Sequence, residues 1–139
     1  MEPNFKAFFE LGPFLQMVFD PSFRIVAVSD AHAKATLIRR EEVLGRHLFE
    51  VFPDNPDNSG ADGVSNLRNS LLNVMKTRRA DTMDVQRYDV PIPESEEFEV
   101  RYWKIRNTPI LGDDGYVLWI LNTVEDVTEL TNLREAAKR

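Results

Sequence analysis

The chain has 139 residues, the length of one ordinary domain, and its 42% hydrophobic and 29% charged residues are typical of a globular protein. Its 23 acidic residues outnumber its 17 basic ones and give a formal net charge of −6, which argues against nucleic acid as the main partner, because phosphate binding needs a concentrated positive field. The sequence contains no cysteine, which excludes disulfides, thiolate metal centres, thiol nucleophiles and a covalent cysteinyl–flavin adduct.

No segment has the pattern of a targeting or membrane-spanning sequence. The first residues, MEPNFKAFFE, lack the basic flank and apolar run of a secretory signal. No other apolar run approaches the ~20 residues that are needed to span a bilayer. We therefore expect a cytoplasmic location without membrane insertion.

A short amphipathic helix is predicted within residues 1–13. Phe5, Phe8 and Phe9 follow the i, i+3, i+4 spacing of an apolar stripe on a helix, and a Gly-Pro pair then ends the pattern.

A β-hairpin and two short helices are predicted next. Residues 13–30 contain two apolar, β-prone segments that are separated by an Asp-Pro-Ser turn, which suits a hairpin. Asp30 is expected to cap the helical turn over residues 31–38, because its carboxylate can accept free amide hydrogens. Residues 40–45, REEVLG, are expected to form a second short helix that ends at its glycine.

The rest of the chain combines a loop, a long helix and three strands. Residues 53–63 are rich in Pro, Asn, Asp and Gly and are predicted to form a surface loop. From residue 64 to 75 the apolar residues keep a helical period, with polar residues on the other side. Strands are predicted at 82–90, 98–111 and 116–124, with turn signals between them.

This order of elements resembles a PAS domain. The resemblance spans roughly residues 14–130 and rests on GRHLFEVFP after the second short helix, RYWKIRNTPIL on the penultimate strand and EDVTEL after the last strand. Residues 126–128, Asp-Val-Thr, are its most specific marker, because they directly follow the last strand, where many bacterial PAS domains carry Asp-Ile-Thr or Asp-Val-Thr. FPDNPD, VQRYDV, RYW, NTP and VEDVTE together resemble the PAS modules of bacterial sensor histidine kinases and hybrid kinases.

The resemblance implies an α+β fold. The expected sheet is antiparallel, with five strands in the order 2-1-5-4-3, with short helices and one long helix over one face, and often with a ligand cavity between the layers. Residues 1–13 are then an N-terminal cap helix, residues 14–126 the sensor domain, and residues 127–139 the start of a C-terminal signalling helix.

Side chains alternate along a strand, so each expected strand turns one face toward the helices. The resemblance places the residue two before the aspartate of Asp-Val-Thr inward, which fixes the inward face of the last strand. Counting back from Pro109 fixes the inward face of the penultimate strand. The strand before it is set by its apolar alternation. The candidates for lining a cavity are Met83, Val85, Arg87, Arg101, Trp103, Ile105, Asn107, Leu118, Ile120, Asn122 and Val124.

Trp119 and Leu121 are expected to face outward. Apolar area left in water costs ~25 cal/mol per Å², so these side chains should be covered. We expect the stripe of Phe5, Phe8 and Phe9 to cover them, either on the same sheet or across a homodimer.

Four polar side chains of the inward set each allow two interpretations. Asn107 and Asn122 offer amides to a polar ligand, or they bond to each other, to a buried water or to nearby backbone, as buried amides usually do. Arg87 and Arg101 can clamp an anion. Their position near strand ends favours solvent contact or pairing with neighbouring acidic residues instead.

The residues do not favour haem or catalysis. The long helix carries no histidine, so His47 is the remaining candidate for a haem ligand, and a lone histidine is more often a polar surface or core residue. Non-covalent flavin stays open, with Trp103 stacking on it, although Trp103 is more often a core residue. There is no P-loop, Ser/His/Asp signal, telling carboxylate pair or metal-binding histidine cluster, so neither catalytic nor metal residues are assigned.

The C-terminal residues predict a signalling helix. Leu130, Leu133 and Ala137 have the a, d, a spacing of a coiled coil, with an ordinary amphipathic tail as the alternative. Together with the resemblance, this spacing indicates the start of a linker helix, and we expect an effector beyond Arg139 in the same chain.

We therefore expect the sensory part of a larger bacterial protein, with a sensor histidine kinase of a two-component phosphorelay as the parent. A small ligand or a partner would favour one arrangement of the sheet, and the junction at Asp126 and Thr128, capped by its own side chains, would pass that change to paired helices. The alternatives are a ligand-free PAS dimerisation scaffold and a small-molecule enzyme on a similar fold.

Overall fold

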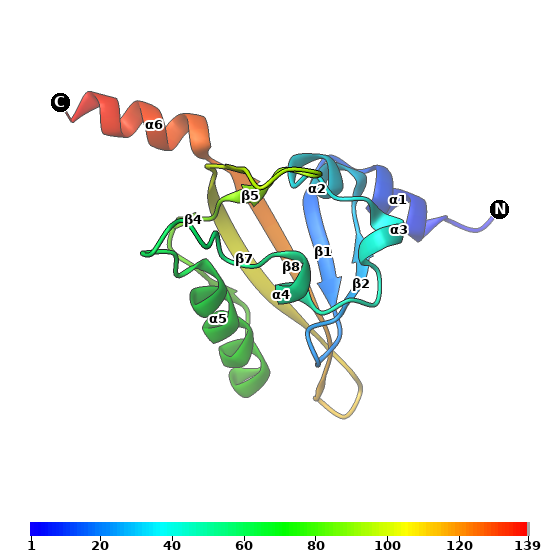
Figure 1. The fold of residues 1–139 in the computed structure, drawn as a ribbon. Coiled ribbons are helices and arrows are strands. Elements are labelled where there is room, and N and C mark those ends of the chain that lie inside the picture. Colours follow the sequence, from blue (N-terminus) through cyan, green and yellow to red (C-terminus); the bar gives the residue numbers. More distant parts are fainter. Residues whose placement is uncertain (139) are drawn as a thin grey trace.

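An antiparallel sheet forms the centre of the structure, a computed structural model that describes residues 1–138. Its strands lie in the order β2-β1-β8-β7-β3, and a further short strand, β4, also pairs with β7 (Figure 1). The predicted α+β fold is confirmed, whereas the strand order differs in detail from the predicted five strands, because β3 and β4 both pair with β7. The strands of this sheet are β1 (Leu15–Phe19), β2 (Ile25–Val28), β3 (Asp81–Thr82), β4 (Gln86–Arg87), β7 (Tyr102–Leu111) and β8 (Val117–Asp126).

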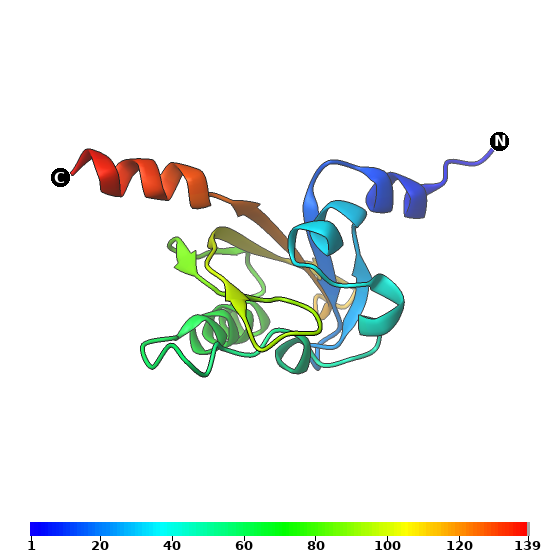
Figure 2. The ribbon, with the colours of Figure 1, turned by 45° about the horizontal axis from the view of Figure 1, so that its top comes forward.

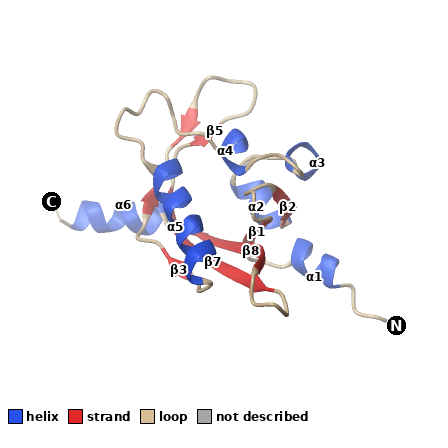
Figure 3. Ribbon diagram, turned by 90° about the horizontal axis from the view of Figure 1, so that it is seen from below, coloured by secondary structure: helices blue, strands red, loops and turns tan. Residues whose placement is uncertain are grey.

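Helices cover one face of this sheet. Helices α2 to α5 lie on the same side, whereas α1 and α6 project from the fold in opposite directions (Figures 2 and 3). Among the described residues, no helix is both long and apolar enough to cross a membrane. The helices are α1 (Phe5–Leu11), α2 (Asp30–Ala35), α3 (Arg40–Val43), α4 (Leu48–Val51), α5 (Gly63–Thr77) and α6 (Thr128–Ala137).

Local hydrogen bonds explain the predicted turn and correct one predicted cap. The Oδ1 atom of Asp20 accepts from the amides of Ser22 at 2.9 Å and Arg24 at 3.0 Å, which closes the hairpin between β1 and β2. Helix α2 is capped by Ser29, whose Oγ accepts from the amide of residue 32 at 3.3 Å. The predicted cap, Asp30, is the first residue of the helix and pairs with Arg40 instead.

The main core lies between the sheet and helix α5. Leu71 and Val74 of α5 are fully buried against Phe19 of β1 and Ile120 of β8. Burial of these apolar faces supplies most of the driving force for folding, at ~25 cal/mol per Å² of apolar surface. A second, smaller cluster contains Val90 together with Trp103 and Ile105, which lie near the N-terminal end of β7.

The predicted strand over residues 82–90 is broken into short pieces. The register pairs Asp81 with Asn107 in β3, but Gln86 with Trp103 in β4, so one extra residue lies on the outer strand between the two pairings. Such an irregularity moves every later side chain to the other face of the sheet. Beyond β4, residues Val90–Pro91 form β5, which pairs with β6 (Phe98–Glu99) in a separate sheet.

A similar irregularity occurs at the start of β8. Ile110 pairs with Trp119 and Leu111 with Val117, so Leu118 is the extra residue of a β-bulge. Val117 is therefore buried at 8% exposure, whereas Leu118 is 48% exposed. The expectation that Leu118 faces inward is wrong, because the strict alternation that it assumed holds only from Trp119 onward.

The C-terminal helix was predicted over residues 127–139. Helix α6 covers Thr128–Ala137, and Arg139 lies outside the described residues. The predicted coiled-coil positions Leu130 and Leu133 are exposed on α6.

The bulge can be tested with two neighbouring truncations. Val117→Ala should lower the free energy of unfolding by about 2 kcal/mol, because it leaves a gap in the core. Leu118→Ala should change it by less than about 0.5 kcal/mol, as expected for a surface position. Urea denaturation of both variants measures the difference, and a larger loss at Leu118 would contradict the bulge.

Candidate functional site

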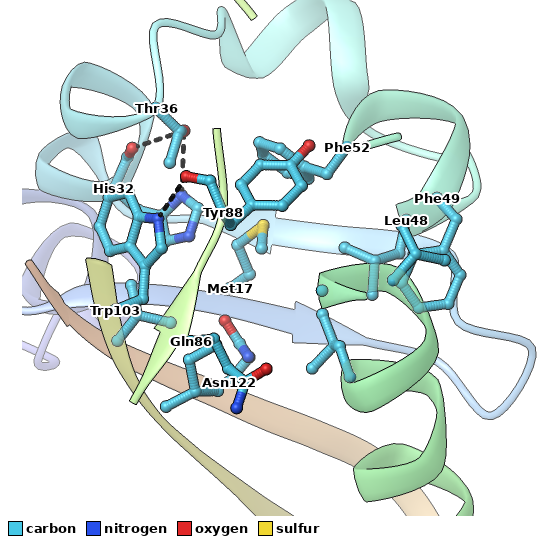
Figure 4. A pocket seen from close by; sticks show the side chains of 15 residues that line it. Met17, His32, Thr36, Leu48, Phe49, Phe52, Gln86, Tyr88, Trp103 and Asn122 are labelled. Carbon is cyan, nitrogen blue, oxygen red and sulfur yellow. Dashed lines mark hydrogen bonds between the residues drawn. The ribbon is translucent and has the colours of Figure 1, made fainter. Parts of the chain in front are cut away.

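A cavity of about 70 Å³ lies between the inner face of the sheet and helices α2, α4 and α5. Most of the side chains around it are apolar. Figure 4 shows Met17 and Asn122 on the side of the sheet, with Leu48 and Phe49 of helix α4 at another side. The cavity is smaller than the ~300 Å³ at which pockets for drug-sized ligands begin, so it suits a small molecule.

Four residues of the predicted inward set line this cavity. Trp103 and Ile105 come from β7, and Asn122 and Val124 come from β8. Three more face inward but are packed away from the space: Asn107 and Ile120 are fully buried, and Met83 is half-buried against the cluster around Trp103.

Three predicted cavity residues point elsewhere. Val85 is 48% exposed and Leu118 equally so, while the side chain of Arg87 is 44% exposed. The extra residue between β3 and β4 reverses the faces of Val85 and Arg87, and the bulge in β8 displaces Leu118. In β4, Gln86 lines the cavity in place of Val85 and Arg87, for which the sequence pattern predicted this role.

The two arginines form ion pairs and not an anion clamp. Arg87 donates from Nε and Nη2 to the two carboxylate oxygens of Asp89, at 3.0 and 3.1 Å. Arg101 pairs with Glu99, and its Nε lies 3.9 Å from Asp126 Oδ2 near the start of α6. Both arginines are thus paired with neighbouring acidic residues, which was the favoured interpretation of their sequence positions.

Asp89 holds the segment after β4 against the loop that precedes α5. Its side chain is 2% exposed and accepts from Asn55 Nδ2 at 2.9 Å as well as from Arg87. Burial raises the pKa of Asp89, but the hydrogen bonds from Arg87 and Asn55 and the charge of Arg87 outweigh it and hold the pKa below its usual value.

Tyr88 closes the cavity beside this segment. Its hydroxyl donates to the carbonyl oxygen of Pro53 at 2.7 Å, and its carbonyl oxygen accepts from Trp103 Nε1 at 3.3 Å. Burial raises the pKa of Tyr88, so the hydroxyl stays a donor. Gly63 allows this close approach, since a Cβ there would lie 3.2 Å from the ring of Tyr88. The sequence offered no signal that this tyrosine would border the cavity.

His32 also lines the cavity and was not assigned to it from the sequence. It lies on α2 at 2% exposure, with Nδ1 3.4 Å from Thr36 Oγ1 and its ring 6.1 Å from that of Phe52. Burial disfavours the charged imidazolium and lowers its pKa to about 4, against a weaker opposing effect of a backbone hydrogen bond. His32 is therefore neutral at pH 7.

His47, the candidate haem ligand, does not line this cavity. It caps α4, where its Nδ1 accepts from the amide of Phe49 at 3.2 Å. Its ring packs between those of Phe23 and Phe49, at 6.5 and 5.7 Å. Within the described part of the chain, no three His, Asp or Glu side chains are placed to hold a metal ion together.

A row of polar groups runs from the cavity to the edge of the sheet. Asn122 Nδ2 donates to Asn107 Oδ1 at 2.8 Å, so the predicted pairing of the two amides is present. Asn107 Nδ2 donates to Ser70 Oγ of α5 at 2.9 Å, and Ser70 donates to Asp81 Oδ2 at 2.6 Å. Among residues 1–138, the Oδ1 atom of Asn122 finds no hydrogen-bond partner.

Hydrogen bonds to β7 hold the junction between β8 and α6. Thr128 Oγ1 accepts from the amide of Tyr102 at 2.9 Å and donates to Asp126 Oδ1. The same Asp126 oxygen accepts from the amide of Thr128 at 2.9 Å, and the amide of Val127 donates to the carbonyl of Tyr102 at 2.9 Å. The signature residues thus fasten the start of α6 to the strand that borders the cavity.

The predicted apolar surface is exposed on this chain. Trp119 is 41% exposed and Leu121 is half-buried on the face without helices. Phe5 and Phe8 are 72% and 63% exposed, and only Phe9 is half-buried. Helix α1 lies against α2 (Figure 3), so it does not bury its stripe on its own sheet. The expected cover within one chain is wrong, and a cover across a dimer stays a prediction.

Comparison with known proteins identifies the fold. The sequence matches the family described as PAS fold over residues 9–132. No curated protein matches it in sequence.

Three solved structures illustrate the similarity. A PAS domain from Colwellia psychrerythraea has a TM-score of 0.68 at 12% identity, over 88% of this chain and 93% of its own. A sensory box sensor histidine kinase from Vibrio cholerae has a TM-score of 0.60 at 19% identity, over 88% and 87%. A LOV protein from Rhodobacter sphaeroides has a TM-score of 0.69 at 16% identity, over 95% and 69%. At these identities the likeness concerns the fold.

The buried histidine predicts a pH-dependent stability. The pKa of His32 is about 4 in the folded protein and 6.5 in the unfolded chain. The unfolded chain therefore binds a proton at a higher pH than the folded protein does. The contribution of the neutral ring to stability is complete above pH 6.5 and is lost toward pH 4, by roughly 3 kcal/mol in total.

Urea denaturation between pH 7 and pH 4 measures this loss. His32→Gln should show a shallower decline of the unfolding free energy over this range than the wild type. His47→Gln removes a histidine outside the cavity and should keep the wild-type slope. Equal slopes for all three proteins would contradict a buried, neutral His32.

Proposed function

Since this chain belongs to the PAS fold family, we propose that it is the ligand-sensing domain of a larger bacterial signalling protein whose effector is a histidine kinase. The observation that carries the proposal is a shared pair of strands. The cavity is walled by β7 and β8, and the same two strands hold the start of α6. The histidine kinase of Vibrio cholerae among the structural neighbours supports this choice of effector.

The signal would pass from the cavity to α6 through two consecutive residues of β7. Trp103 lines the cavity and directly follows Tyr102, whose amide and carbonyl are both bonded to the residues that begin α6. A ligand that binds better to one arrangement of β7 and β8 stabilises the matching position of α6. The shift in output cannot exceed the difference in its affinity for the two arrangements.

The proposed parts of the chain follow from this role. Residues 1–13 serve as a cap helix, residues 14–126 as the sensor, and residues 127–139 as the beginning of a signalling helix that pairs with its copy in a homodimer. We place the protein in the cytoplasm, with the kinase core in the same chain.

The ligand that we propose is small and largely apolar. The cavity of about 70 Å³ is too small for haem or flavin without rearrangement of its walls. Its polar side chains, His32, Thr36, Gln86 and Asn122, are few and lie among apolar ones, an arrangement that fixes the orientation of a ligand.

The second candidate function is a dimerisation scaffold without a ligand. Exposed apolar side chains favour it: Trp119 and Ile110 pair on the open face of the sheet and are each 41% exposed, and Phe5 and Phe8 extend on α1. In this case the cavity is a packing defect and the apolar face alone conveys the change.

Native mass spectrometry together with an absorption spectrum of the purified chain distinguishes these candidates. We expect an added small mass on the protein. Val64→Phe, which fills the cavity from the N-terminal end of α5, should remove this mass, and Leu72→Phe, on an exposed part of the same helix, should keep it. A bare dimer in both variants and in the wild type would favour the scaffold.

The junction predicts a defect in signal transfer. In the full-length protein, Thr128→Val removes the hydroxyl that accepts from Tyr102 and donates to Asp126 but keeps the shape of the side chain. The ratio of autophosphorylation rates with and without the ligand found by mass spectrometry should fall toward one. Thr131→Val, one turn later on α6, is the matched control. An unchanged ratio in Thr128→Val would remove the proposed role of the junction.

A further inference from the structure

Asp81, Asn107 and Asn122 lie side by side on three neighbouring strands. Asp81 of β3 is the register partner of Asn107 of β7, which is in turn the partner of Asn122 of β8. Ser70 of α5 lies above this row and links Asn107 to the carboxylate of Asp81. Asn107, Asn122 and Ser70 are at most 5% exposed, whereas Asp81 is half-buried at the edge of the sheet.

The charge of Asp81 sets the direction of every hydrogen bond in the row. A carboxylate can only accept, so the hydroxyl proton of Ser70, 2.6 Å from Asp81 Oδ2, must point to it. The oxygen of Ser70 then has to accept, so Asn107 turns Nδ2 toward it and is left with Oδ1 for Asn122. Asn122 therefore donates from Nδ2. If the amide of either asparagine were flipped, two donors or two acceptors would face each other. The hydrogen-bond network therefore determines which side-chain atom is O and which is N.

The other end of the row lies in the cavity. Asn122 borders the cavity at 1% exposure, and among residues 1–138 its Oδ1 has no hydrogen-bond partner. A buried acceptor without a donor is unfavourable until something donates to it. Each bond in such a row also polarises the next, so the negative charge of Asp81 strengthens Oδ1 of Asn122 as an acceptor.

We propose that Asp81 determines the ligand selectivity of the cavity through this row, without touching the ligand. It commits Asn122 to accept, so the ligand has to present an N–H or O–H group there, on a small and otherwise apolar body. A molecule of the same shape with an ether or carbonyl oxygen at that point binds several-fold more weakly. This inference rests on the proposed ligand-binding function and specifies the chemical class of the ligand.

Pyrrole and furan test the inference directly. The two rings have nearly the same size and shape, but pyrrole presents an N–H donor where furan presents an oxygen. Titration of isotope-labelled protein by NMR gives both dissociation constants, and the side-chain amide signal of Asn122 reports binding at this point. The wild type should prefer pyrrole by roughly five- to tenfold, the ratio expected for one hydrogen bond.

Two variants break the row at different links. Asp81→Asn removes the charge and lets the row run in either direction, and Ser70→Ala removes the link between Asp81 and Asn107. In either variant the preference should fall to within about twofold, while both probes still bind, because neither residue lines the cavity. Asp84→Asn removes a nearby exposed charge outside the row and should keep the wild-type preference.

The outcomes separate this inference from the proposed function. If the wild type binds both probes equally or prefers furan, or if the preference survives in the folded Asp81→Asn or Ser70→Ala protein, the selectivity of the row is wrong and the cavity still binds ligands. If neither probe binds the wild type, the cavity is not a ligand site, and the proposed sensing of a small molecule fails together with this inference.

Discussion

Strands β7 and β8 pair without interruption from Trp103 opposite Asp126 to Ile110 opposite Trp119. Their side chains must alternate between the two faces of the sheet, so the position of one residue fixes that of the others. One face supplies Trp103 and Ile105 to the cavity, together with side chains of β8, and the other face leaves Ile110 exposed. A shift of one residue in this pairing would put the apolar wall of the cavity into water and the charged outer residues into the core. The cavity, the core and the polar row all depend on this one register.

The polar row is unusual within such a core. Two asparagines and a serine are buried where apolar side chains of similar size would pack without any need for partners. Buried polar groups are tolerable when each finds its partner, and among residues 1–138 every side-chain group of the row has one except the Oδ1 atom of Asn122. The residue that carries the unsatisfied atom, Asn122, lines the cavity. A requirement of folding alone would not favour this position, whereas binding of a donor does.

Much of this arrangement could be predicted from the sequence, because alternation is a property of the backbone. The resemblance set the inward face of the last strand and counting back from Pro109 set that of the penultimate strand, and alternation then placed Trp103, Ile105, Asn122 and Val124 inward. The pattern failed for Val85 and Leu118, since an extra residue leaves no local signal when the residues on both sides of it are apolar or mixed. The sequence pattern also could not predict contacts between residues that lie far apart in the chain. Nothing in the spacing of His32 or Tyr88 shows that the helices bring them to the cavity, because that depends on how α2 and the segment after β4 pack on the sheet.

Tyr102 of β7 joins the wall of the cavity to the beginning of α6. Its amide donates to Thr128 Oγ1 and its carbonyl oxygen accepts from the amide of Val127, so the beginning of α6 is held by one residue of β7. The next residue, Trp103, is buried against the cavity and donates from its indole to the carbonyl of Tyr88. The far end of β7 pairs with β8, where Leu111 lies opposite Val117, a residue of the main core. Under the proposed sensing function, a ligand in the cavity would act on α6 through this one residue, Tyr102, while the core beneath α5 keeps its packing. If α6 is the output helix that we propose, this division would let it change position without unfolding of the centre of the domain.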